Sequence, residues 1–77
     1  MKEFQVILSS FEDIQAFVSL AMVQPFEVMA GSERHSVNGK NFMGMLTLDY
    51  CHPVRIRMDC PQEAFEQFLR QAERFLA

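Results

Sequence analysis

A strongly one-sided helix is predicted at the end of the chain, and it limits the folds that this chain can adopt. From Pro61 to Leu76, apolar residues recur at intervals of three and four, the period of an α-helix. On a helical wheel they fill one arc of about 140°. This arc must be buried, and only a sheet of the same chain is large enough to cover it. It consists of Ala64, Phe65, Phe68, Leu69, Ala72, Phe75 and Leu76.

Four segments in which apolar residues alternate with polar ones are predicted to form that sheet. In the clearest of them, Val54, Ile56 and Met58 alternate with charged residues. Arg55 and Arg57 therefore share the opposite face, where they could bind an anion, although a solvated sheet face explains them better. The third segment is the most polar and is predicted to pair with the second in a hairpin. The predicted strands cover residues 4–8, 26–30, 33–37 and 54–58.

Another long helix is predicted to begin after Ser10, which has a typical N-cap side chain. Asp13 follows three residues later, so the two resemble a capping box with Asp in place of Glu. The pair Gln24-Pro25 ends this helix. Phe17 lies at the edge of the apolar stripe, and Leu20 points away from it and is expected to be half exposed. The stripe is formed by Phe11, Ile14, Val18, Ala21 and Met22.

A short helix is predicted over residues 41–48, with Asn41 as its N-cap. The elements then follow in the order β-α-β-β-α-β-α. Two long helices with one apolar face each can cover one face of a four-stranded sheet. We therefore expect an α/β (α+β) open-faced sandwich, in which two long helices and one short helix lie on one face of a four-stranded antiparallel sheet. Residues 1–77 form a single domain.

Composition and charge exclude several classes of protein. The chain of 77 residues is 49% hydrophobic and carries a net charge of −3, so it has no basic footprint for nucleic acid. No apolar run reaches membrane length. The start at Met1-Lys2-Glu3 does not resemble a signal peptide, so we expect a cytosolic protein. Its two cysteines, Cys51 and Cys60, are then expected to stay reduced.

The segment of residues 37–48 identifies a family. It resembles the segment Val-Asn-x-Lys-Ser-φ-Met-Gly-φ-φ-Ser-Leu, where φ is apolar, of the phosphocarrier HPr of the bacterial phosphotransferase system. The resemblance implies the HPr-like open-faced sandwich. In that family, a histidine at the start of the first long helix receives a phosphoryl group from enzyme I. In this chain the segment reads Val37-Asn38-Gly39-Lys40-Asn41-Phe42-Met43-Gly44-Met45-Leu46-Thr47-Leu48.

This sequence departs from the family at both phosphorylation sites. The loop of the form Gly-φ-His-Ala-Arg-Pro-Ala is absent, and the corresponding region offers no His, Arg or Pro. Asn41 stands where Gram-positive members have a regulatory serine, and it keeps the capping capacity without being phosphorylatable. The residues at the degenerate phosphohistidine region are Ser9, Ser10, Phe11, Glu12 and Asp13.

The resemblance also implies a surface for protein partners. In the family, the short helix and the start of the first long helix form the docking surface for several proteins. Methionines, which adapt to varied partners, are abundant in this short helix. Alternatively, Phe42, Met45 and Leu46 close the end of the core. The predicted partner-binding residues are Phe11, Leu20, Phe42, Met43, Met45 and Leu46, beside Asn41.

No other chemistry-bearing group has the spacing of a known site. Neither His35 nor His52 follows the first strand, so we expect both to be surface or loop histidines. The set Cys51, His52, Asp59 and Cys60 lacks the ligand spacing of a zinc site, and capping explains Ser10 without chemistry. We predict no metal, no cofactor and no enzymatic activity, since no pair of groups has the spacing of a catalytic dyad.

We therefore expect a degenerate HPr-like protein that acts as a non-catalytic protein-interaction or regulatory module, without histidine phosphocarrier activity. Its expected partners are phosphotransferase-system or regulatory proteins, and neither nucleic acid nor membrane. Two alternatives remain open. One is a working phosphocarrier whose phosphorylation site has moved, for example to His52. The other is a structural homodimer that packs its methionine-rich surfaces together; the oligomeric state is not predicted.

Overall fold

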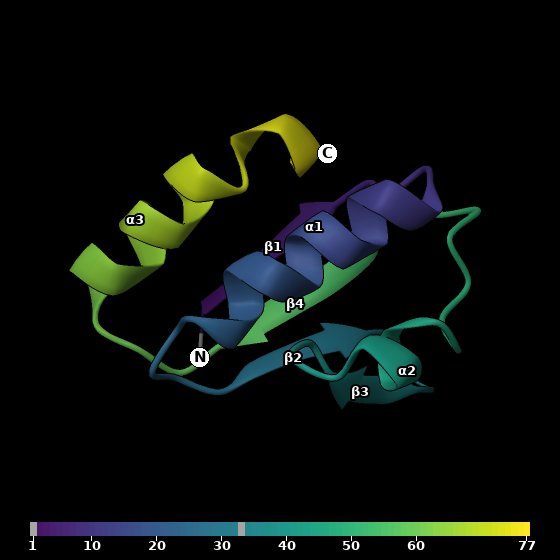
Figure 1. The fold of residues 1–77 in the computed structure, drawn as a ribbon. Coiled ribbons are helices and arrows are strands. Elements are labelled where there is room, and N and C mark those ends of the chain that lie inside the picture. Colours follow the sequence, from purple (N-terminus) through teal and green to yellow (C-terminus); the bar gives the residue numbers. More distant parts are fainter. Residues whose placement is uncertain (1, 33) are drawn as a thin grey trace.

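The computed structural model describes residues 2–32 and 34–77, which form a four-stranded antiparallel sheet with its helices on one side (Figure 1). The predicted α+β class and the predicted order of the elements are both confirmed. No helix within the described residues is long and apolar enough to span a bilayer. The elements are β1 (Lys2–Val6), α1 (Phe11–Met22), β2 (Val28–Gly31), β3 (Ser36–Asn38), α2 (Phe42–Met45), β4 (Val54–Met58), α3 (Gln62–Gln71) and the 3₁₀ turn η1 (Glu73–Phe75).

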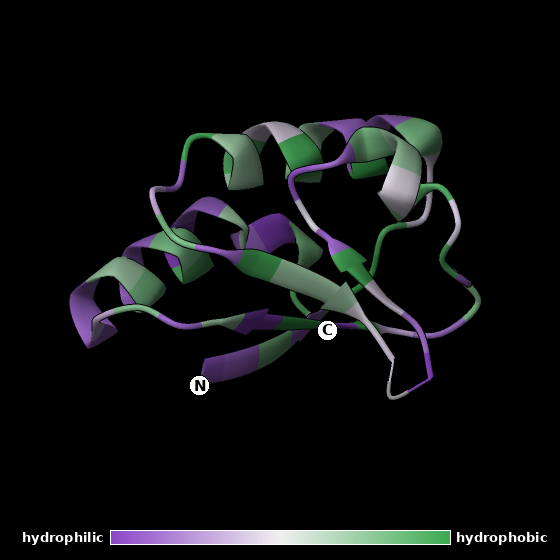
Figure 2. Cartoon of the chain, turned by 90° about the horizontal axis from the view of Figure 1, so that it is seen from below, coloured by the Kyte–Doolittle hydropathy of each residue, from purple (hydrophilic) through white to green (hydrophobic). Residues whose placement is uncertain are grey.

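The strands lie in the order β1-β4-β2-β3, and each neighbouring pair is antiparallel. The central strand β4 shows the predicted alternation: Val54, Ile56 and Met58 are buried. Arg55 and Arg57 are only partly buried and face the side away from the helices. Figure 2 shows the molecule turned by 90°, with the helices above the strands and with purple and green segments alternating along α3. One sheet face is therefore covered, and the other is open.

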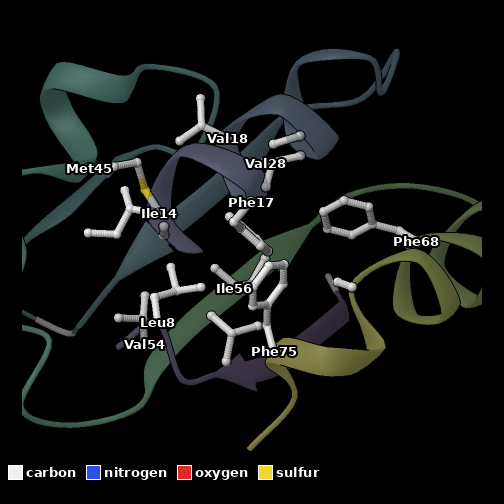
Figure 3. Close-up of a cluster of buried hydrophobic side chains, with 14 of the residues drawn as sticks. Leu8, Ile14, Phe17, Val18, Val28, Met45, Val54, Ile56, Phe68 and Phe75 are labelled. Carbon is white, nitrogen blue, oxygen red and sulfur yellow. The ribbon is translucent and has the colours of Figure 1, made fainter. Parts of the chain in front are cut away.

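Side chains from both long helices, α2 and the sheet meet in one core (Figure 3). Phe17 of α1 is fully buried in it. Its ring lies 5.8 Å from that of Phe68 in α3 and 6.2 Å from that of Phe75 in η1, both in edge-to-face arrangements. Such aromatic pairs add to the stabilisation that comes from burial alone. The three rings connect the two helical segments with each other above β4.

The predicted apolar stripe of α1 is wrong at both ends and at its edge. Ile14, Phe17, Val18 and Ala21 form the buried face, so Phe17 lies at its centre. Phe11 and Met22 are 56% and 62% exposed. The helical period predicts the direction of each side chain, but not whether another element lies opposite it. Both residues lie in the terminal turns of α1, beyond the part of the helix that packs on the core.

The bounds of several elements differ from the prediction. The first strand lies two residues earlier than predicted, and Leu8 is buried beyond its end. The strands on both sides of the hairpin are short, and Glu33, where the third strand was predicted to begin, lies outside the described residues. The predicted helix 41–48 is helical only from Phe42 to Met45, with turns after it. Pro61 is the N-cap residue of α3.

The end of the chain corrects the prediction of a continuous final helix. After Ala72 the chain forms η1 and then runs beside the outer edge of β1. The backbone N–H of Ile7 donates to Phe75 O at 2.7 Å, and the N–H of Ala77 donates to Gln5 O at 3.0 Å. Backbone groups on the edge of a sheet need partners. These bonds supply them, and they require the chain to leave the helix.

The hairpin between β2 and β3 depends on Gly31. Its φ is 145°, in a region that residues with a side chain rarely adopt. A Cβ atom at this position would lie 2.1 Å from the carbonyl oxygen of His35. That oxygen accepts the N–H of Ser32 at 2.8 Å, so it is part of the turn itself. The turn therefore excludes a side chain for two independent reasons.

We predict that Gly31→Ala lowers the free energy of unfolding by about 2 kcal/mol or more, because the substitution adds both strain and a clash. Urea denaturation followed by circular dichroism measures this change. Gly44→Ala is the matched control. Its Cβ would make ordinary contacts, the nearest 3.4 Å from Val37 Cβ, and alanine favours a helix. Equal stability of the two variants would contradict the role assigned to Gly31.

Candidate protein-docking surface

The start of α1 is closed by its own side chains. The backbone N–H of Asp13 donates to Ser10 Oγ at 3.1 Å, so Ser10 is the predicted N-cap. The Asp13 carboxylate accepts the N–H and the hydroxyl of Ser9, at 3.2 and 3.1 Å. In a capping box, the carboxylate binds the N–H of the N-cap residue itself. The predicted capping box is therefore half confirmed: Asp13 N–H binds Ser10, but the carboxylate binds Ser9, which offers two donors to the same oxygen.

The start of α1 carries negative charge. Glu12 and Asp13 lie in the first turn of α1, and residues 8–14 contain neither His nor Arg. Carboxylates are favourable at a helix N-terminus. Because they are negatively charged, the same carboxylates repel an incoming phosphate there. Residues 8–14 therefore offer no imidazole to carry a phosphoryl group and no guanidinium to stabilise one.

The short helix α2 is held at both ends by side chains. Asn41 Oδ1 accepts the N–H of Gly44 at 3.3 Å, as predicted for an N-cap. At the other end, the hydroxyl of Thr47 donates to Gly44 O at 2.7 Å and the hydroxyl of Tyr50 donates to Met45 O at 2.5 Å. The sequence analysis missed these two caps. The contact of Thr47 is local and detectable in a sequence, whereas that of Tyr50 depends on the path of the loop.

Four of the predicted partner-binding residues form an apolar surface where α1 meets α2. The rings of Phe11 and Phe42 lie 5.2 Å apart in an edge-to-face arrangement. Phe11 is 56% exposed, Met43 71% and Leu46 40%. Phe42 is partly buried and packs against the core. Phe42 and Leu46 are four residues apart, so they are neighbours on the surface of this segment. We call Phe11, Phe42, Met43 and Leu46 the Phe11/Met43 surface.

The other two predicted residues are not part of this surface. Met45 is fully buried, so its predicted role in binding a partner is wrong. A helix as short as α2 must place one side chain in the core to be held there, and Met45 is that side chain. Leu20 is partly buried and packs against the core. It lies nine residues after Phe11, about 13 Å along the axis of α1.

Both histidines line one cleft, of about 280 Å³, beside the β2–β3 turn. His35 Nε2 lies 2.9 Å from Thr47 Oγ1. Because that hydroxyl donates to Gly44 O, it accepts from His35, and Nε2 must carry a proton. His52 is exposed and lines the same cleft. The described residues contain no group of three His, Cys, Asp or Glu side chains that could hold a metal ion.

The loop between α2 and β4 contains a carboxylate and a thiol that affect each other. The backbone N–H of Cys51 donates to Asp49 Oδ1 at 2.8 Å, and this bond lowers the pKa of Asp49. The carboxylate in turn raises the pKa of the Cys51 thiol, mainly by accepting its hydrogen bond. A raised pKa disfavours the thiolate, which is the reactive form. Cys51 is exposed and Cys60 buried, and both are free thiols, as predicted.

Tyr50 gives a pH-dependent prediction for the end of α2. Burial raises the pKa of its phenol from 10.0 to about 12. The folded state therefore holds the phenolic proton more tightly than the unfolded chain does. The resulting contribution to the free energy of unfolding is complete below pH 10 and is lost as the pH rises towards 12. We expect Tyr50→Phe to cost about 1 kcal/mol at pH 8. The stability difference from the wild type should shrink between pH 10 and 12 in urea denaturation. A difference that stays constant over this range would contradict the prediction.

Comparison with known proteins supports the fold and no finer assignment. No protein-family model matches this sequence, and no curated protein matches it. The structure is similar to the crystal structure of HPr-C-His from Thermoanaerobacter tengcongensis, with a TM-score of 0.72. The similarity covers 95% of this chain and 92% of that chain, at 18% sequence identity. An identity this low establishes the fold and not the activity. The chain therefore has the HPr-like fold, a four-stranded open-faced α+β sandwich.

Proposed function

We propose that this chain is a cytosolic protein-binding module with an HPr-like fold, related to the phosphotransferase system, that does not carry a phosphoryl group on histidine. It binds partner proteins through the Phe11/Met43 surface. The observation that carries this proposal is the chemistry at the start of α1. Ser9, Ser10 and Asp13 satisfy one another there, and no imidazole or guanidinium is part of that stretch.

The exposed side chains at the junction of α1 and α2 support the binding half of the proposal. Met43 is 71% exposed although it belongs to a helix that is anchored in the core through Met45. Phe11 is held against Phe42 rather than buried. Large aromatic and methionine side chains are typical of the centres of protein interfaces.

Phosphorylation provides a direct test of the first half. We expect no acid-labile label on this protein after incubation with enzyme I and labelled phosphoenolpyruvate. An authentic HPr in a parallel reaction should become labelled, which shows that the enzyme is active. Acid-labile label on this chain would overturn the proposal that it is not a carrier. The reaction should be run at several enzyme concentrations, so that slow transfer is detected as well.

Substitutions at exposed positions test the second half. We predict that Met43→Asp and Phe11→Asp abolish the capture of a partner that the wild-type protein retains from a lysate of its source cells. Because both positions are exposed, neither change should alter the stability by more than about 0.5–1 kcal/mol. Val23→Asp is the matched control, at a position that is 73% exposed and lies just after the other end of α1.

Two results would contradict the placement of the binding surface. One is unchanged capture of every partner by Met43→Asp. The other is an equal loss with Val23→Asp, which would point to a general effect of the added charge. Light scattering on the same proteins tests the homodimer. A dimer that Met43→Asp dissociates would mean that the partner is a second copy of this chain.

The two-histidine cleft favours a second candidate, a carrier whose phosphorylated residue has moved. The proton on His35 Nε2 leaves Nδ1 of the neutral ring with its lone pair, which is the form of imidazole that attacks phosphorus. His52 lines the same cleft. If the protein became labelled, His35→Ala and His52→Ala would separate the two positions. Loss of the label in only one of them would identify the phosphorylated residue.

A further inference from the structure

The open face of the sheet carries a hollow whose ionisable lining residues, among those that the structure describes, are both arginines. It has a volume of about 350 Å³ and is lined by Gln5, Gly31, Ser32, Arg34, Pro53 and Arg55. Gln5 pairs with Arg55 across β1 and β4, and Arg55 pairs with Gly31 across β4 and β2. Directly paired residues share one face of a sheet. Gly31 therefore lines the hollow beside Arg55 with backbone atoms only.

The two arginines of the open sheet face differ in how they are held. Arg57 Nη2 donates to Ser36 Oγ at 3.0 Å. Arg55 Nε lies 3.7 Å from Glu3 Oε1, and the two side chains are 38% and 49% exposed. An exposed pair at this distance contributes little energy. The guanidinium of Arg55 is therefore available to a ligand at small cost. Arg57 already has a protein partner, so the predicted solvated sheet face explains it without a ligand.

A second hollow continues from the first. The two-histidine cleft shares Gly31, Ser32 and Pro53 with the arginine-lined hollow. Its walls include Leu48 and Val54 together with the imidazoles, so it is lined more by apolar groups. Asp49 also lines it, but this carboxylate is held by the N–H of Cys51 at 2.8 Å. The two hollows thus place cationic donors on one side of the β2–β3 turn and ring-sized apolar walls on the other.

We propose that these two hollows form one binding site for a small aromatic phosphate monoester. Its phosphate binds the guanidinium groups of Arg34 and Arg55 and the amide of Gln5. Its ring lies between Pro53 and the imidazole-lined wall. Guanidinium groups bind phosphate with two parallel hydrogen bonds each, which makes a pair of arginines suited to a dianion. The hollow of Arg34 and Arg55 lies on the open sheet face, and this site does not depend on the proposed function.

Titration of the ¹⁵N-labelled protein, followed by NMR, tests the site with four probes at constant ionic strength: inorganic phosphate, phenyl phosphate, benzoate and benzyl alcohol. We expect phenyl phosphate to bind roughly tenfold more tightly than inorganic phosphate, because the ring leaves water. Its chemical-shift changes should lie at Gln5 and in residues 31–32, 34–36 and 48–55. Benzyl alcohol should bind most weakly. Tighter binding of benzoate than of phenyl phosphate would overturn the assignment of the ligand as a phosphate.

The arginine variants decide whether the proposed groups hold the phosphate. We expect Arg55→Gln and Arg34→Gln each to weaken phenyl phosphate about tenfold or more, since each removes a charge-assisted contact. Arg57→Gln is the matched control, with the same loss of charge on the same strand and face, and should leave the affinity within about twofold. Equal weakening by Arg55→Gln and Arg57→Gln would overturn the proposal. The spectrum of each variant without ligand shows whether it is folded, and Arg55→Lys provides a second, milder variant.

Discussion

The structure depends on burying one face of a small sheet with few side chains. Phe17, Phe68 and Phe75 lie edge to face in the core and connect α1 with α3 and η1. Replacing such a buried ring by alanine typically costs about 3–5 kcal/mol, a large share of the stability of a domain of this size. The remaining elements follow from this constraint. The helices must lie on the apolar side of β4, and its arginines must lie on the other.

The same constraint explains how a helix of four residues persists in α2. An isolated helix of this length is unstable in water. Here Met45 occupies the core, and side chains bind the backbone at both ends of the element. Lys40 Nζ also donates to Gln24 O at 2.6 Å, which connects the turn before α2 to the loop after α1. Met43 lies between these anchors and stays exposed, so the same contacts hold α2 in place and leave Met43 at the surface.

Sequence patterns were sufficient for those features that depend on local chemistry. The alternation in β4, the N-caps Ser10 and Asn41, and the apolar arc of the last helix up to Ala72 predicted what the structure contains, whereas Leu76, which was predicted in that arc, is 38% exposed. The candidate docking surface was predicted in part, because Phe11 and Met43 are exposed while Met45 is not. Methionine is compatible with both a core and an interface. Its residue type alone therefore does not distinguish between these roles.

The sequence by itself determined the order of the elements, the sidedness of β4 and α3, and the lack of histidine and arginine at the start of α1. Each of these follows from residue types at short spacing. Only the tertiary structure decided that Phe17 is central, that the chain leaves its last helix to pair with β1, and that His35 meets the loop containing His52. The physical reason is the same in each case. A periodic pattern gives the direction of a side chain from its own backbone, but what lies opposite depends on segments far away in the chain.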